Sequence, residues 1–143
     1  MPKTLVALFG LAFLAVGGFA LAQVPKTASP AGAKVYFIAP KNGAKIKGPV
    51  KVVMGLSGMG IAPAGTDAAD TGHHHILVDA DAPNVDMPLP VDDKHRHFGK
   101  GQTETTLDLP PGKHTLQLVL GDKNHIPHNP PVMSEKITVT VSK

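Results

Sequence analysis

Short runs of alternating or β-branched apolar residues recur along the chain from residue 35 onward, separated by glycine and proline. Leu116, Leu118 and Leu120 occupy alternate positions, and the segment 137–141 repeats the pattern. Alternate side chains of a strand share one face, so both segments predict strands with one buried face. Helical periodicity is not found after residue 22. The pattern predicts strands at 35–39, 50–57, 73–79, 103–109, 114–122 and 134–141.

Six short strands joined by turns predict an all-β fold, an antiparallel β-sandwich of immunoglobulin-like or cupredoxin-like type. Pro110, Pro111 and Gly112 predict a hairpin between the fourth and fifth strands. The connections 58–72 and 80–102 have no regular pattern and exceed the usual loop length. Long loops on a compact sandwich are typically functional or disordered.

Residues 1–22 contain an early lysine, an apolar run and Ala20-Leu21-Ala22, which is typical of a cleaved secretory signal. A retained membrane anchor is the alternative, although the apolar run is short for a membrane span. Residues 23–33 are small, polar and proline-bearing and predict a flexible leader. We therefore expect a single domain over 34–143, in the periplasm or secreted, without stable membrane insertion after cleavage.

Composition narrows the function further. Cysteine is absent, so disulfides are excluded and stability comes from packing or a bound ion. The formal charge of +3, which falls to +2 without Lys3, is too small and scattered to predict nucleic-acid binding. Aromatic residues make up 4% of the chain, which argues against a stacking surface for bases or sugars. The unusual enrichment is in histidine, of which there are eight.

Three of the histidines are consecutive, in the segment GHHHILVD at 72–79. On a strand, His74 shares a face with Ile76 and Val78 and is expected to be a core residue bonded to backbone. His73 and His75 share the opposite face, with Cβ atoms roughly 6.5 Å apart. Two imidazoles at this spacing can bind one ion, so His-x-His is a chelating unit.

The strand arrangement predicts which other residues join them. If the strand 73–79 runs antiparallel to the strand 114–122, its first residues lie at the end of the sandwich where 114–122 finishes, which we call a pole. His114 begins that strand, at the opposite pole, and is expected to be structural. The residues predicted to converge as metal ligands are His73, His75, His97 and His125, with His128, His95 and Met59 as auxiliary ligands.

The type of ligand predicts the type of ion. Neutral imidazole binds zinc, copper or nickel, and thioether adds a preference for cuprous ion. The acidic segment DAADTG at 67–72 lacks the full spacing of a calcium loop. Histidine and methionine without cysteine, in an oxidising compartment, favour copper first and zinc second. Asp79, Asp122 and Glu104 are candidate partners for the ligand histidines, with Asp122 preferred.

The segments GMGIAPAG, GHHHILVD and HFGKGQTETTLDLPPGKHTLQLVLGDKNHIPHNPPVMSEKITVTV together resemble a small secreted bacterial family, domain of unknown function 4399. The resemblance covers most of residues 35–141. It implies a fold and an exported location more than an activity. A more distant similarity, to periplasmic copper carriers with β-sandwich folds, rests on composition and architecture alone.

The leading hypothesis is a periplasmic protein that takes up, buffers or delivers copper through a histidine-rich rim, with a periplasmic metalloprotein or transporter as a further partner. The first alternative is an immunoglobulin-like interaction module without metal. The second is an enzyme, a zinc hydrolase or copper redox protein, for which Glu104 would be the candidate base. No serine has a nucleophile-elbow setting, and the expected mature terminus, Gln23, lacks the histidine of oxidative polysaccharide-cleaving enzymes. We therefore expect no catalysis.

Overall fold

The computed structural model describes residues 23–143, and the predicted signal at 1–22 lies outside them. Over residues 23–143 every regular element is a strand, so the all-β prediction is confirmed. No helix in this range is long and apolar enough to cross a membrane. The strands are β1 (Lys34–Ala39), β2 (Lys45–Lys47), β3 (Val50–Ser57), β4 (Gly60–Ile61), β5 (Thr71–Val78), β6 (His95–His97), β7 (Glu104–Leu107), β8 (Gly112–Gly121) and β9 (Ile137–Ser142).

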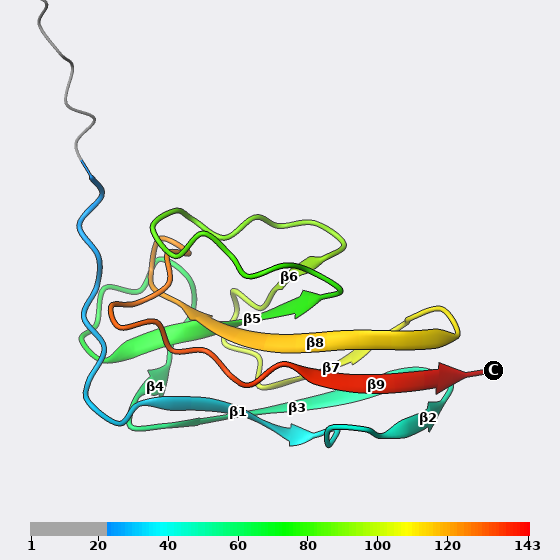
Figure 1. Ribbon diagram of the computed structural model, residues 1–143. Coiled ribbons are helices and arrows are strands. Elements are labelled where there is room, and N and C mark those ends of the chain that lie inside the picture. The colour runs from blue at the N-terminus through cyan, green and yellow to red at the C-terminus, as the bar shows by residue number, and fades with distance from the viewer. Residues whose placement is uncertain (1–22) are drawn as a thin grey trace, which may run out of the picture.

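The strands form two sheets that pack face to face as a β-sandwich (Figure 1). The smaller sheet has the order β1-β3-β7, and the larger has β2-β9-β8-β5-β4, with β6 added beside β5. The central pairs are antiparallel, as predicted, including β5 with β8. Two short edge strands, β2 and β4, pair in parallel with β9 and β5.

The core lies between the sheets. Leu116, Leu118 and Leu120 of β8 are fully buried there, which confirms the alternation read from the sequence. Val50 and Val52 of β3 meet them from the smaller sheet and are also fully buried. Each fully buried aliphatic side chain contributes about 1.5–3 kcal/mol relative to exposure, so this layer fixes the positions of both sheets.

The predicted hairpin at residues 110–112 is wrong. β7 pairs with β3 in the smaller sheet, whereas β8 pairs with β5 and β9 in the larger one. Leu107 is buried in the core from the side of the smaller sheet, so the turn carries the chain from one layer to the other. The turn residues do reverse the chain, but local sequence does not say which sheet each strand joins.

The leader segment is attached to the domain. Thr27 Oγ1 donates a hydrogen bond of 2.7 Å to Asp122, and Lys26 forms a 2.9 Å ion pair with Asp86. Ala28 forms a β-bridge with Asn129. Residues 26–29 thus lie across the loop that follows β8. The composition of residues 23–33 predicts a flexible segment, whereas these contacts hold residues 26–29 against the domain.

Candidate metal centre

The two faces of β5 have different environments. Ile76 and Val78 belong to the main core, whereas Leu77 packs with Leu89 and Val119 in a separate small cluster. Because side chains alternate along a strand, His73 and His75 project with Leu77. They therefore lie on the face of the larger sheet that points away from β1 and β3, beneath the loops seen beside β6 in Figure 1.

Strand β6 brings a third histidine to this face. It pairs antiparallel with β5, and His97 lies directly opposite His75. Residues directly opposite in such a pair have Cβ atoms about 4.5–5.5 Å apart on the same face. The sequence predicts a loop at His95–His97, whereas the structure has a strand there. The position of His97 is therefore set by the pairing of β6 with β5.

The fourth histidine, His125, comes from the loop after β8. The Asp122 carboxylate accepts hydrogen bonds from the backbone N–H groups of Asn124 at 2.8 Å and Ile126 at 3.0 Å. The Asp122 carbonyl accepts one from the His125 N–H at 2.9 Å. The backbone of His125 has a positive φ, in the left-handed region that L-residues rarely adopt. Asp122 thus holds the loop in the turn that presents His125.

These four histidines form a compact group, which we call the tetrad: His73, His75, His97 and His125. One potential ligand atom from each lies within 4.8 Å of the others. His73 Nε2 lies 3.0 Å from His75 Nε2 and 3.1 Å from His125 Nδ1. Two nitrogens bound at about 2.0–2.1 Å to one tetrahedral ion lie about 3.3 Å apart, and at square-planar corners about 2.9 Å. The two spacings at His73 fall between these values, and the four ligand atoms together extend over no more than 4.8 Å.

Burial favours the neutral form of three histidines of the tetrad, His73, His75 and His97. Loss of solvation lowers the pKa of His73 to about 4, with His125 and His97 adding to the effect. Burial, followed by His73, lowers the pKa of His75 to about 2. The pKa of His97 is also lowered, by burial and by His125. Neutral imidazole is the form that binds a metal ion, so these rings are ready to bind at neutral pH.

Two glycines make room for the rings. A Cβ at Gly121 would lie 2.8 Å from His75 Nε2, and a Cβ at Gly99 would lie 2.3 Å from His97 Cε1. Both distances are shorter than carbon contacts allow, so any side chain there would displace the imidazole. Sequence reasoning misses these glycines. Their only signal is their place directly after a strand or histidine segment, in HFGKG and LGDKNH.

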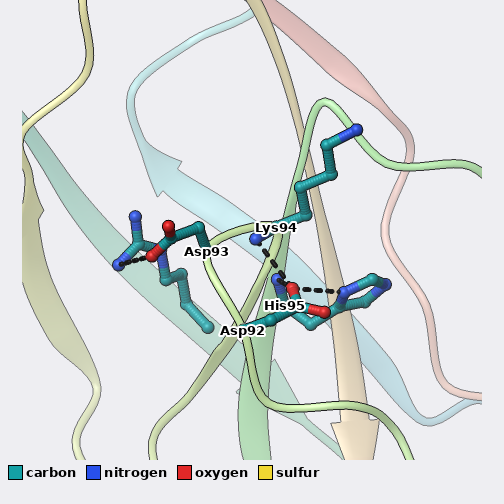
Figure 2. Close-up of polar contacts among 5 residues, drawn as sticks. Asp92, Asp93, Lys94 and His95 are labelled. Atoms are coloured by element: carbon teal, nitrogen blue, oxygen red, sulfur yellow. Dashed lines mark hydrogen bonds and ion pairs between the residues drawn. The ribbon is translucent and has the colours of Figure 1, made fainter.

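The auxiliary candidates lie outside the tetrad. His128 is fully buried, with Nε2 3.1 Å from the Thr71 carbonyl oxygen. Met59 is partly buried and packs against the main core. His95 shares a strand with His97, but its ring contacts Asp92 (Figure 2). The sequence predicts a histidine-rich rim, but the tetrad is less exposed than that, because His73 and His75 are 1% and 0% accessible.

The remaining histidines, His74 and His114, are predicted to be structural and not metal ligands. His74 is fully buried, as expected for a core position, but within residues 23–143 neither of its ring nitrogens has a hydrogen-bond partner. The expected backbone bond is therefore wrong. His114 is structural: its Nδ1 is 2.6 Å from Asp79 and its Nε2 is 2.7 Å from the Pro110 carbonyl.

The acidic candidates have structural contacts. Asp122 supports the His125 loop and also accepts the Thr27 hydrogen bond, while Asp79 contacts His114. Glu104 lies on β7 in the smaller sheet and pairs with Lys51 at 3.8 Å. The candidate base is thus placed on the other layer of the sandwich from the tetrad.

Fold and site together define a β-sandwich protein with a four-histidine cluster, two of its members fully buried, that could hold a metal ion. Residues 52–142 match the family described as "Domain of unknown function (DUF4399)", and the chain belongs to that family. No curated protein matches the sequence.

Among solved structures, the chain is similar to the endo-beta-1,4-mannanase from Thermotoga petrophila, with 22% identity and a TM-score of 0.45. The similarity covers 78% of this chain and 20% of that one, so the chain spans about a fifth of the enzyme's length.

Proposed function

We propose that this protein binds one transition-metal ion in the tetrad, with copper as the physiological ion, and that it takes up, buffers or delivers copper in the periplasm. The observation that carries the proposal is the crowding of three imidazole nitrogens, with His73 Nε2 3.0 and 3.1 Å from two others. A ring nitrogen has one lone pair or one proton, so it cannot form two well-directed hydrogen bonds. A cation at the common point would satisfy all three lone pairs.

Copper is preferred over zinc on chemical grounds. Both ions accept imidazole, and copper binds nitrogen sites more tightly in the divalent series. The predicted export signal and the absence of cysteine suit an oxidising compartment, in which histidine is the available nitrogen ligand. His97 and His125 are only half-buried, which leaves one side of the tetrad for ligand exchange with a periplasmic metalloprotein or transporter.

Calorimetric titration of the protein with cupric, cuprous and zinc ions tests this proposal. We expect one tight site per chain, and a loss of affinity of at least about 100-fold in the double variant His73→Gln/His75→Gln, since each lost ligand costs 10-fold or more. Urea unfolding of the metal-free variant checks that it folds.

His114→Gln is the matched control, because His114 lies toward the opposite end of β8 from Gly121 and the tetrad. This variant should keep the tight site. Absence of tight binding in the unmodified protein would refute the proposal and favour the interaction module without metal. Equal losses in both variants would show that the effect is not specific to the tetrad.

A further inference from the structure

His95 lies on the same face of the larger sheet as His97. The two are successive residues on one face of β6, opposite Leu77 and His75 of β5. Leu77 is buried in the small cluster with Leu89, and the Leu89 N–H donates to the His125 carbonyl at 2.8 Å. His95 is thus on the tetrad face of the sheet, one same-face step beyond His97.

A carboxylate orients the His95 ring. Figure 2 shows Asp92 beside it, with His95 Nδ1 2.8 Å from Asp92 Oδ1. The same oxygen accepts the backbone N–H groups of Lys94 at 2.8 Å and His95 at 2.9 Å, so the carboxylate is fixed by three contacts. An Nδ1–H donated to a carboxylate leaves the lone pair on Nε2. This is the arrangement that accompanies histidines that bind metal.

The surroundings of His95 are more open than those of His73 and His75. Its side chain is 18% accessible and lines a cavity of about 400 Å³ formed by the segment 79–95. Met87, which is 56% exposed, lines the same cavity, as does the carboxylate residue Asp81. Imidazole, thioether and carboxylate side chains at one opening offer weak, exchangeable contacts to a cation.

We propose that His95 is an outer docking ligand, which binds a transition-metal ion at the surface and passes it to His97 and, through His97, to the other three histidines of the tetrad. The proposal rests on the metal-binding function proposed above and adds a route to it. Each step exchanges one neutral ligand for another on the ion: a water leaves when His95 Nε2 binds, and His95 leaves when the tetrad binds. The ion keeps its oxidation state, so no co-reactant is needed.

Stopped-flow loading with cupric ion tests the route, with release to a chelator measured in the reverse direction. In His95→Gln we expect loading and release each to be slowed about tenfold. The equilibrium affinity of the tetrad should stay within a factor of about two of that of the unmodified protein. A change in rates without a change in affinity is expected of a ligand on the path and is not expected of general damage to the fold.

Asp92→Ala should also slow loading, because it removes the oxygen that accepts from Nδ1 and fixes the ring with Nε2 free. Asp93→Ala is the matched control. Asp93 is a fully exposed neighbour that contacts Arg96 at 3.9 Å, and its substitution makes the same change in charge. If both aspartate variants are equally slow, the effect is one of surface charge and the orienting role is refuted.

The outcomes separate the two proposals. Tight binding with an unchanged loading rate in His95→Gln refutes the docking role and leaves the proposed function intact. A large loss of equilibrium affinity in His95→Gln shows that His95 belongs to the final site, which also refutes the route. Absence of tight binding in the unmodified protein refutes the proposed function and, with it, the route.

Discussion

His73 is the residue on which the metal site depends most. Its Nε2 is the nitrogen shared by both short contacts within the tetrad, and its ring is almost fully buried. In a protein without an ion, burying several imidazoles together removes solvation and returns few good hydrogen bonds. A bound cation would offset that cost, because each neutral ring would direct a lone pair at it.

The lowered pKa values predict how metal affinity depends on pH. Below its pKa, each ligand histidine must lose a proton to bind, which weakens affinity by a factor of ten per pH unit. Four ordinary imidazoles with a pKa of about 6.5 would together weaken affinity about 1,000-fold between pH 6.5 and 5.5. His73 and His75, with pKa values of about 4 and about 2, are already neutral there.

We therefore expect affinity to fall by no more than about 30-fold between pH 6.5 and 5.5, since His73 and His75, two of the four ligands, stay neutral in that interval. Competition titrations in a non-coordinating buffer measure it. A fall close to 1,000-fold would show that the four rings titrate as ordinary exposed histidines, and the burial of His73 and His75 would be refuted.

Alternation along β5 is sufficient, from the sequence alone, to separate His73 and His75 from His74. It cannot place His128 or Met59, because both follow or precede strands in irregular segments, where no period fixes the side-chain direction. His128 is instead buried beside the Thr71 carbonyl, and Met59 is packed against the core. A residue in an irregular segment can be close in sequence to the strand end that forms the site and still lie on the other face of the sheet.

At the scale of elements, the position of His97 depends on β6, a strand of three residues. So short a segment carries no detectable period, and the sequence HRH on its own predicts a loop. Its register with β5 arises from backbone pairing along an edge that β4 leaves free beyond Gly72. Long-range pairing of this kind also determines that β7 joins β3, which the turn at 110–112 cannot reveal.

The pairing of β5 with β8 gives a prediction for Gly121. This glycine lies opposite His73, and a Cβ there would be 2.8 Å from His75 Nε2. Gly121→Ala should displace the His75 ring and weaken metal binding about tenfold or more, since small shifts of a ligand are costly at a metal site. Calorimetric titration measures the change.

Gly60→Ala is the matched control, because a Cβ at Gly60 on β4 meets only Thr71 Cγ2 at the ordinary distance of 3.7 Å. It should leave affinity within about a factor of two, since no neighbour has to move. Unchanged affinity in Gly121→Ala would mean that the ring has room to turn, and the close packing of the tetrad against β8 would be refuted.

At the scale of the whole molecule, the two sheets bury an aliphatic core on one face of β5 and leave the tetrad on the other. The segment 79–94 and the loop 122–130 meet on that second face, where Leu89 packs beside Leu77 and its N–H donates to the His125 carbonyl. The leader contacts both segments, through Lys26 with Asp86 and through Thr27 with Asp122. The sandwich thus supplies a rigid floor, and sequence-distant loops complete the site above it.

X-ray absorption at the copper edge of the copper-loaded protein tests the central claim most directly, because it reports the ligands of the ion itself. The tetrad predicts three to four imidazole nitrogens at about 2.0 Å, with the outer-shell scattering of histidine rings. A shell of oxygen ligands with one imidazole or none would contradict it.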